Sequence, residues 1–398
     1  MKFGIENLLS SPEYLERLKS KRVALLAHPA SVESSLQHSL NLLLARPEIN
    51  LSCAFGPQHG MRGEKQDNMI ESDDYEDPVA KIPVYSLYGK TRRPTEKMLS
   101  NFDVLLVDLQ DVGARIYTFI TTIFYFLEDC KDQEIWILDR PNPIGRQIEG
   151  SFLKPEFESF VGASRIPMRH GLTLGEAALW FKKEKSLNLN IEVIKMSGYQ
   201  LDQAPGYGWP LFEKSWVNPS PNVPRLSTTR IYPGSVILEG TNLSEGRGTT
   251  LPLEVFGAPE LDHEKILKYL MQNFSGWANG CGLRACFFEP TFHKFTGQLC
   301  EGLQVHVDDH NYDPNLFKPY RLMAAYFRSI RALYPDYNLW REPPYEYEYE
   351  RLPVDLITGS DFFRKWVDEK SLTANDFDAV LVKDEDDWSN EAQSYYLY

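Results

Sequence analysis

The sequence predicts an α/β fold, with a Rossmann-like N-terminal domain built on a parallel sheet and a smaller α+β C-terminal domain. Short, continuously apolar runs alternate with helical patterns through the first half, which is typical of parallel strands buried on both faces. The chain has 398 residues, more than one ordinary core accommodates. A proline-rich stretch, NPSPNVPRL at 218–226, reads as an extended linker. We therefore expect domains at 1–224 and 225–398, the first carrying a cleft and the second closing it.

The first half predicts strands and helices in alternation. The expected strands lie at 22–31, 49–60, 82–89, 103–113, 134–145 and 190–196, and the expected helices at 34–47, 94–102, 117–130 and 172–185. Pro47 would end the first of these helices. The second opens with a proline and has a glutamate in its first turn, both favourable at a helix start. The third is apolar on nearly all sides, and its length fits a buried crossover helix.

The second half has a different pattern, typical of a smaller α+β domain. We expect a strand and a Gly/Thr-rich loop within 232–252, strands at 282–292 and 301–309, and helices at 262–274, 317–335 and 360–370. Ser360 is suited to cap the last of these helices. The segment PPYEYEYERLP at 343–353 alternates Tyr and Glu, so we expect it to pack along a surface.

Composition excludes several classes of partner. The formal net charge is -14, so nothing in the chain is suited to neutralise nucleic-acid phosphates or an anionic membrane surface. No apolar window is long enough for a membrane span. The start lacks an apolar core of signal-peptide length, so we expect a cytoplasmic protein, although a processed secreted chain would look the same. The five cysteines are widely spaced and read as free thiols. The oligomeric state stays open.

Polar, Gly/Pro-rich turns follow several of the expected strands: AHPAS, GPQHG, DLQDVGAR and DRPNPIG. In open α/β sheets ligands bind outside the carboxyl ends of the strands, so these turns are expected to build one cleft. Some of the Asp and Asn side chains could instead cap helices. The candidate residues in these turns are His59, Arg62, Asp108, Gln110, Asp111, Arg115, Asp139, Arg140 and Asn142.

The sequence lacks the motifs of several common classes of enzyme. GxGxxG is absent after the first strand and GxxxxGK[ST] is absent throughout, which argues against a nucleotide cofactor. The eight histidines are scattered without HExxH spacing, which argues against a metal site. GxSxG is missing, and Ser220 reads as a turn residue. We therefore expect neither cofactor nor metal.

Carboxylates and hydrogen-bonding groups remain, as in sites that bind and hydrolyse sugars. Glycoside hydrolysis needs a carboxylic acid to protonate the leaving oxygen, and usually a second carboxylate. The candidate carboxylates are Glu64, Glu71, Asp108, Asp111, Asp139, Glu239 and Glu245. The arginines Arg62, Arg115, Arg140 and Arg247 could grip a substrate carboxylate. Composition does not choose among these residues.

Long strings along nearly the whole chain resemble the exo-β-N-acetylmuramidase family of peptidoglycan recycling. They include GPQHGMRG (56–63), PVYSLYG (83–89), DLQDVGARIYTFITT (108–122), LDRPNPIG (138–145), IPMRHGLTLGE (166–176), NPSPNVP (218–224), YPGSVILEGTNLSEGRGTT (232–250) and TFHKFTGQLCEGLQVHV (291–307). The resemblance implies a Rossmann-like domain with a smaller C-terminal domain. It also implies release of N-acetylmuramic acid from non-reducing ends of muropeptide fragments, without a cofactor. The lactyl carboxylate of that sugar would be a partner for the cleft arginines.

Gln58 departs from the family pattern at the position that matters most. Typical members read Gly-Pro-Glu-His-Gly, and that glutamate is the favoured general acid/base, but an amide cannot donate a proton as a carboxylic acid does. Glu64 or Glu71 of the same loop could act instead, as could Asp108, Asp111 or Glu245. Alternatively, the protein binds a muramyl sugar without cleaving it, or cleaves something else.

The resemblance thus completes the list of candidate site residues. We expect catalytic roles for Glu64, Glu71, His59 and Asp108. We expect substrate contacts from Gln58, Arg62, Gln110, Asp111, Arg115, Tyr117, Asp139, Arg140, Asn142, Asn242, Glu245 and Arg247. The resulting hypothesis is a glycosidase acting on peptidoglycan fragments, and the alternative is a non-catalytic muropeptide-binding protein.

Overall fold

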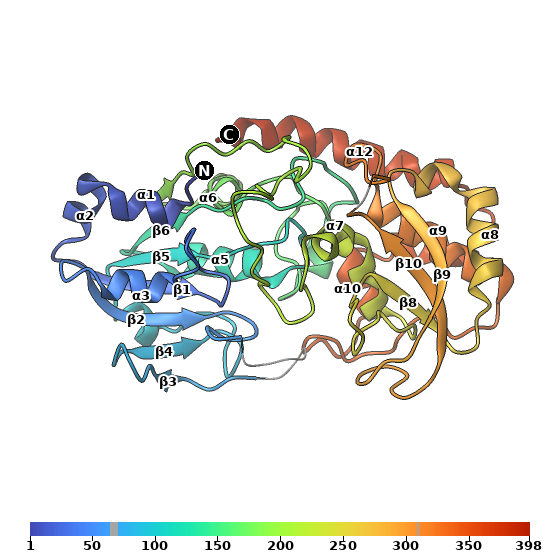
Figure 1. Ribbon diagram of the computed structural model, residues 1–398, viewed down its shortest axis with the longest axis horizontal. Coiled ribbons are helices and arrows are strands. Elements are labelled where there is room, and N and C mark those ends of the chain that lie inside the picture. The colour runs from blue at the N-terminus through green and yellow to red at the C-terminus, as the bar shows by residue number, and fades with distance from the viewer. Residues whose placement is uncertain (64–70, 309) are drawn as a thin grey trace.

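A parallel sheet forms the centre of the first half in the computed structural model, which describes residues 1–63, 71–308 and 310–398 (Figure 1). Its seven strands lie in the order β3-β4-β2-β1-β5-β6-β7, and β3 alone runs antiparallel to its neighbour. The strands are β1 (Arg22–Ala27), β2 (Asn50–Gly56), β3 (Tyr75–Glu76), β4 (Pro83–Ser86), β5 (Val104–Asp108), β6 (Glu134–Leu138) and β7 (Ile191–Ile194). The sequence-predicted α/β class is confirmed.

The sheet reverses its direction of growth at β1. From β1 the chain first adds β2 and β4 on one side, then crosses to add β5, β6 and β7 on the other. Ala24 of β1 accordingly pairs with Cys53 of β2 and with Leu105 of β5. Such a switch point opens a crevice at the carboxyl ends of the strands, where ligands bind in this class of fold.

Helices cover both faces of this sheet. They are α1 (Gly4–Ser10), α2 (Pro12–Leu18), α3 (Ser39–Leu44), α4 (Glu96–Leu99), α5 (Thr118–Asp129) and α6 (Leu174–Glu184). The interior position of α5 follows from its sequence TFITTIFYFLED, which has almost no polar face and is buried along most of its length. The helix expected at 34–47 is shorter, because it begins after His38, whose side chain accepts a hydrogen bond from the Leu40 amide.

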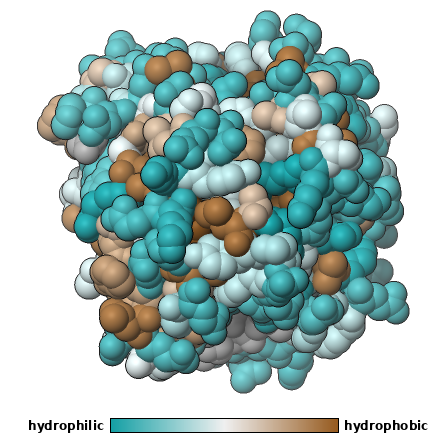
Figure 2. All heavy atoms as spheres, turned by 90° about the vertical axis from the view of Figure 1, so that its right-hand side faces the viewer, coloured by the Kyte–Doolittle hydropathy of each residue, from teal (hydrophilic) through white to brown (hydrophobic). Residues whose placement is uncertain are grey.

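The second half packs helices against a small antiparallel sheet of order β8-β10-β9. Its elements are α7 (Leu226–Ser235), a 3-10 helix (Val236–Gly240), β8 (Val255–Ala258), α8 (His263–Asn273), β9 (Gly282–Phe288), β10 (Cys300–His306), α9 (Pro319–Leu333), α10 (Pro353–Thr358), α11 (Phe362–Asp368) and α12 (Ala374–Ala392). Short 3-10 turns lie at Pro155–Phe157, Ser275–Ala278 and Gln393–Tyr395. On the face that carries α8 and β9, apolar side chains are scattered among hydrophilic ones (Figure 2).

Two expectations for the second half are wrong. The strand expected within 232–252 is absent from that stretch, because α7 and the 3-10 helix occupy its start. Residues LSTTRIYPGS are poor helix formers, but every one of them is buried, so tertiary packing overrides local propensity. The stretch 218–226 is not merely a linker either, since Ser220 and Asn222 are buried against the rest of the molecule.

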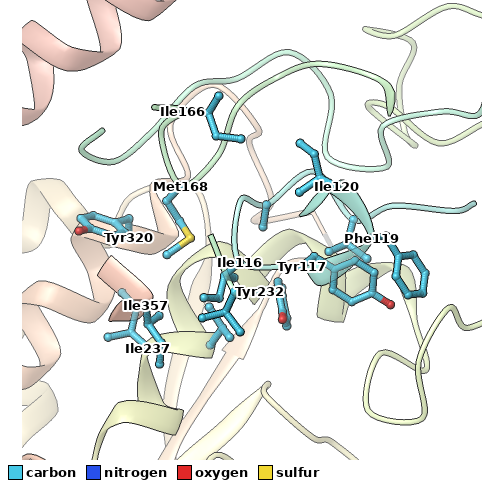
Figure 3. Close-up of a cluster of buried hydrophobic side chains, with 14 of the residues drawn as sticks. Ile116, Tyr117, Phe119, Ile120, Ile166, Met168, Tyr232, Ile237, Tyr320 and Ile357 are labelled. Atoms are coloured by element: carbon cyan, nitrogen blue, oxygen red, sulfur yellow. The ribbon is translucent and has the colours of Figure 1, made fainter. Parts of the chain in front are cut away.

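One apolar core continues through both halves. Ile116, Tyr117 and Phe119 from the first half lie in the same cluster as Tyr232 and Ile237 from the second (Figure 3). The C-terminal helix α12 runs back over the first half, where Trp388 meets Trp180 with ring centroids 5.0 Å apart (Figure 1). This shared core holds the two halves against each other at the carboxyl edge of the sheet.

All five cysteines are free, and Cys53, Cys130 and Cys300 are buried. Burial raises the pKa of the Cys53 thiol to about 11 and that of Cys130 to about 12, so both are neutral and unreactive. Among the described residues, no helix has the length and apolar character needed to cross a membrane.

Candidate active site

A pocket lies at the carboxyl edge of the parallel sheet, between the two halves. The first half contributes the turn after β2, the start of α5 and the segment 220–223, and the second half covers them. The described lining residues are Gln58, His59, Ile116, Tyr117, Thr118, Phe119, Val161, Ser220, Asn222, Val223, Tyr232, Glu239, Arg247, Leu253, Tyr345 and Glu346. Of the residues predicted from sequence, the pocket brings together Gln58, His59, Tyr117 and Arg247.

The turn after β2 directs Gln58 into this pocket. His59 and Gly60 both have positive φ, of 71° and 78°, so the chain reverses immediately after Gln58. A left-handed histidine is uncommon, whereas glycine adopts this conformation freely. Thr118 donates its hydroxyl to Gln58 Oε1 at 2.7 Å, which directs the amide nitrogen elsewhere. The Gln58 side chain also hydrogen-bonds the carboxyl group of Glu346.

Glu346 reaches the pocket from the tip of a tight turn in the second half. Tyr345 and Glu348 exchange two backbone hydrogen bonds of 2.9 Å, and the residues between them, Glu346 and Tyr347, have φ of 46° and 69°. Two central residues with positive φ are normally Asn and Gly. Such backbone strain, about 1–3 kcal/mol per residue, is concentrated at functional sites. The expectation that 343–353 packs along a surface is therefore wrong for Glu346, which is only 7% exposed.

Burial raises the pKa of Glu346 to about 7. Tyr88 opposes the shift by donating its hydroxyl to Glu346 Oε2 at 2.7 Å, and the negative charge of Glu239 adds to it. Arg92 and Gln58 favour the ionised form more weakly. Glu346 is therefore a carboxylic acid that can hold its proton close to neutral pH.

Glu239 is the second carboxylate of the pocket, and its charge is compensated. Arg247 donates to Glu239 Oε1 at 2.6 Å, and Tyr345 donates its hydroxyl to Oε2 at 2.7 Å. Arg247 also lies 3.2 Å from Glu245, which Lys294 contacts at 2.9 Å. Burial alone would raise the pKa of Glu245, but these cations outweigh it and lower that pKa. For Arg247, the two carboxylates outweigh burial and raise its pKa.

Tyr117 and Tyr232 form the aromatic wall of the pocket, with ring centroids 5.7 Å apart (Figure 3). Tyr117 occupies the N-cap position of α5, and Tyr232 lies within α7. Burial raises the pKa of both phenols, so both are neutral at physiological pH. An aromatic face beside hydrogen-bonding groups suits the apolar face and the hydroxyls of a sugar ring.

Asp108 and Arg140 are placed differently from the expectation. Arg140 donates to the two carboxylate oxygens of Asp108 at 2.5 and 3.1 Å, and to the Val32 carbonyl at 2.7 Å. Ser39 donates its hydroxyl to the same carboxylate. Both side chains are buried, and neither is among the described residues that line this pocket, so these contacts give them a structural role while their expected catalytic and substrate-binding roles stay predictions.

Asp139 and Asn142 also satisfy backbone and side-chain groups of the fold. Asp139 accepts hydrogen bonds from the Thr173 hydroxyl, the Gly175 amide and the Tyr398 hydroxyl at 2.7–2.9 Å, which anchors the start of α6. Asn142 donates to the Leu172 carbonyl at 3.0 Å and accepts from the Ile144 amide at 3.1 Å. Asp139 thus caps α6 and Asn142 closes its own turn, while their expected substrate contacts stay predictions.

Gln110, Asp111 and Arg115 are buried, and each hydrogen-bonds backbone groups. Gln110 donates to the Pro141 carbonyl at 2.9 Å, and Asp111 accepts from the Gly113 amide at 2.7 Å. Arg115 donates to the carbonyls of Ser151, Ile166 and Ile357 at 2.8–3.2 Å, which links the two halves. None of the three is among the described residues that line this pocket, and their expected substrate contacts stay predictions.

The loop acids are not placed as expected. Glu64 lies outside the described residues. Glu71 is half-exposed at the rim, where it accepts the Tyr347 hydroxyl at 3.0 Å and lies 3.5 Å from Arg92. Arg62 is half-exposed and pairs with the buried Asp77. In the second half, Asn242 donates to the carbonyls of Asn338 and Trp340 at 2.9 and 3.2 Å.

Sequence reasoning missed Glu346, Ser220, Asn222 and Tyr232 as pocket residues, and considered Glu239 without selecting it. The regular Tyr/Glu alternation around Glu346 is typical of an exposed strand, and a turn with two positive φ values leaves no such pattern. The available clue was the polar stretch NPSPN at 218–222, together with the helix α5, which has almost no polar face. In the described part of the chain, no group of three or more His, Cys, Asp or Glu is placed to hold a metal ion.

Two sequence profiles match almost the whole chain. The profile described as "Exo-beta-N-acetylmuramidase NamZ, N-terminal" matches residues 23–227, and its C-terminal counterpart matches residues 230–398. The chain belongs to the NamZ exo-β-N-acetylmuramidase family. The resemblance inferred from the sequence strings is thereby confirmed.

Individual relatives of this family agree in sequence and in fold. The peptidoglycan β-N-acetylmuramidase NamZ of Bacillus subtilis (strain 168) is 42% identical over 339 residues, covering 84% of this chain and 78% of that protein. Two crystal structures of DUF1343 family proteins from Bacteroides fragilis NCTC 9343 cover 100% of this chain and 98% of theirs. Their TM-scores are 0.84 and 0.73, at 32% and 27% identity.

Proposed function

We propose that this protein is a glycoside hydrolase that releases N-acetylmuramic acid from the non-reducing ends of peptidoglycan fragments. The observation that carries the proposal is a buried pocket with two carboxylates, Glu239 and Glu346, in a chain of the NamZ family. Glycosidic hydrolysis uses one carboxyl group to protonate the leaving oxygen and usually a second to assist at the anomeric carbon. Burial raises the pKa of Glu346 to about 7, so this carboxyl group can hold a proton near neutral pH, as a general acid must.

The arrangement of the pocket supports an exo-acting enzyme. Side chains of both halves line it, and the turn at Tyr345 and Glu346 covers it from the second half. A pocket of this kind accommodates a terminal sugar better than the middle of a chain. Tyr117 and Tyr232 offer an aromatic wall to the sugar ring.

Turnover of 4-nitrophenyl β-N-acetylmuramide tests this function. We expect the protein to release 4-nitrophenol and N-acetylmuramic acid. We expect much slower release from the corresponding β-N-acetylglucosaminide, which lacks the lactyl group. On peptidoglycan fragments, product analysis by mass spectrometry should show N-acetylmuramic acid removed one residue at a time from the non-reducing end. Equal rates on both aryl glycosides would contradict the assigned specificity.

A non-catalytic muropeptide-binding protein is the second candidate, and Gln58 is the observation that favours it. From the family resemblance, position 58 is expected to be a glutamate that acts as the general acid/base. It is a glutamine here, and an amide cannot supply that proton. Isothermal titration with N-acetylmuramic acid separates the two candidates. Saturable binding without any turnover of the aryl muramide would establish the binding protein.

A further inference from the structure

We propose that Glu346 is the proton donor of this glycosidase and that Gln58 positions it. The proposal rests on the hydrolytic function proposed above, and it assigns to the second half the acid that Gln58 does not provide. A glutamine at position 58 is then compatible with catalysis, because the pocket holds another carboxyl group in hydrogen-bonding contact with that same side chain.

The chain builds a specific place for this carboxyl group. Tyr88, from the loop after β4, donates to Glu346 Oε2 at 2.7 Å, and Gln58, from the turn after β2, hydrogen-bonds the same group. The neighbouring Tyr347 is held under Arg92, whose guanidinium lies 3.8 Å from the Tyr347 ring centroid. Two segments distant in sequence, the loop after β4 and the turn after β2, therefore hold the turn in a backbone conformation that Glu and Tyr rarely adopt.

The orientation of the Gln58 amide is determined by its other partner. The Thr118 hydroxyl donates to Gln58 Oε1, so the Gln58 amide nitrogen is the atom free to donate to Glu346. A glutamate at position 58 would instead set two carboxyl groups side by side, and they would share one proton. The amide removes that sharing and leaves Glu346 as the sole titrating member of the pair.

The charged and titratable groups around Glu346 come from several elements. Tyr88 and Arg92 follow β4, Glu239 lies on the 3-10 helix after α7, and Tyr345 and Tyr347 flank Glu346 in its own turn. His59 and Arg247 line the same pocket. Burial is the largest influence on the pKa of Glu346 and raises it to about 7, which suits an acid that works near neutral pH.

The proposed step follows the ordinary balance of glycosidic hydrolysis. The bond between the anomeric carbon and the glycosidic oxygen breaks, and its electron pair stays on that oxygen, which takes the proton of Glu346. Water then supplies a hydroxyl group to the anomeric carbon, and the remaining proton of that water restores the Glu346 carboxylic acid. Water is the only co-reactant.

The leaving group provides the sharpest test, through Glu346→Gln. A poor leaving group needs the acid, whereas 4-nitrophenolate leaves without much help. We expect kcat/KM to fall about 10²–10⁴-fold on the disaccharide of β-linked N-acetylmuramic acid and N-acetylglucosamine. We expect a much smaller fall on 4-nitrophenyl β-N-acetylmuramide. Equal losses on both substrates in a variant with a native unfolding curve, or near-native rates on both, would overturn the assignment.

Three further variants complete the comparison. Glu350→Gln makes the same chemical change at an exposed position of the same Tyr/Glu-rich segment and should leave both rates within about twofold of the unmodified protein. Glu64→Gln and Glu71→Gln test the two acids of the loop after β2. A selective loss on the disaccharide in either of them would move the donor to that loop. If the unmodified protein turns over neither substrate, the hydrolytic function itself fails, which is a different outcome.

Tyr88→Phe and Gln58→Met give a second, independent readout. Each removes a donor that stabilises the ionised Glu346, so the pKa of the acid rises further. Activity that needs the protonated acid is lost as pH rises through this pKa, so the alkaline limb of kcat/KM should move upward. Losing one hydrogen bond predicts a move of roughly 0.5–1 pH unit. An unmoved or lowered alkaline limb in both variants would contradict Glu346 as the donor.

Discussion

Replacing Arg247 with methionine is expected to lower the free energy of unfolding by about 3–5 kcal/mol at pH 7. Arg247 is 4% exposed and lies between the carboxylates of Glu239 and Glu245. Glu245 would keep Lys294 and His293, but Glu239 would lose its closest cation inside the protein. An unpaired buried charge costs more than the pair contributed, so the loss should be large. Urea unfolding, followed by tryptophan fluorescence, measures it.

Lys19→Met is the matched control for this experiment. Lys19 also pairs with a glutamate, Glu16, but both side chains are mostly exposed, at 63% and 73%. An exposed pair contributes about 0–1 kcal/mol, so the midpoint of the urea curve should barely move. A loss below about 1 kcal/mol for Arg247→Met would mean that water or a shifted side chain compensates Glu239. Activity on the aryl muramide should fall in Arg247→Met and stay unchanged in Lys19→Met.

Asp111→Asn is expected to stabilise the protein above pH 7. Burial raises the pKa of Asp111 from its ordinary value of 3.8 to about 7, while the Gly113 amide favours the ionised form less strongly. The folded state thus binds the proton more tightly than the unfolded state, and stability is lost as pH rises from about 4 to about 7. Asparagine removes this loss, which is on the order of 4 kcal/mol at pH 8 and about 1 kcal/mol at pH 4.5.

Urea unfolding at pH 4.5 and pH 8 tests the trend. Asp103→Asn is the control with opposite sign, because Arg22 lowers the pKa of Asp103 and its contribution is present above the unfolded pKa. That variant should be destabilised, and more so at pH 8 than at pH 4.5. If Asp111→Asn is destabilised at pH 8, then another group of the folded protein stabilises the ionised Asp111 carboxylate. The raised pKa of Asp111 would then be refuted.

Local sequence predicted the parallel strands of the large sheet, although not the short antiparallel β3. The run at 103–113 became β5, and the apolar stretch at 117–130 became α5, because burial on every side leaves a continuous apolar run whatever the partners are. The stretch LSTTRIYPGS contains no continuous apolar run of this kind. Its helix α7 exists because the surrounding second half buries all of its residues, which no local propensity records.

The same division holds for the pocket. His59 was predicted because it follows a strand of a parallel sheet, and the carboxyl ends of such strands meet at one edge, whereas Gln58 and Tyr117 were added from the family resemblance. That rule identifies the edge but not which side chains there remain open to a ligand. Asp108, Asp139 and Arg115 stand at the same edge, but an arginine, a helix start and backbone carbonyls are their partners.

The sequence by itself determined the fold class, the family and the anomaly at Gln58, since strand patterns and long identical strings are local properties of the chain. Only the tertiary structure decided which carboxyl group meets that glutamine. Glu346 lies 288 positions further along the chain, in a turn whose positive φ values are not predicted by any pattern in the sequence. Its burial beside Gln58, Tyr88 and Glu239 results from the packing of the two halves, and that burial is what raises the pKa of its carboxyl group.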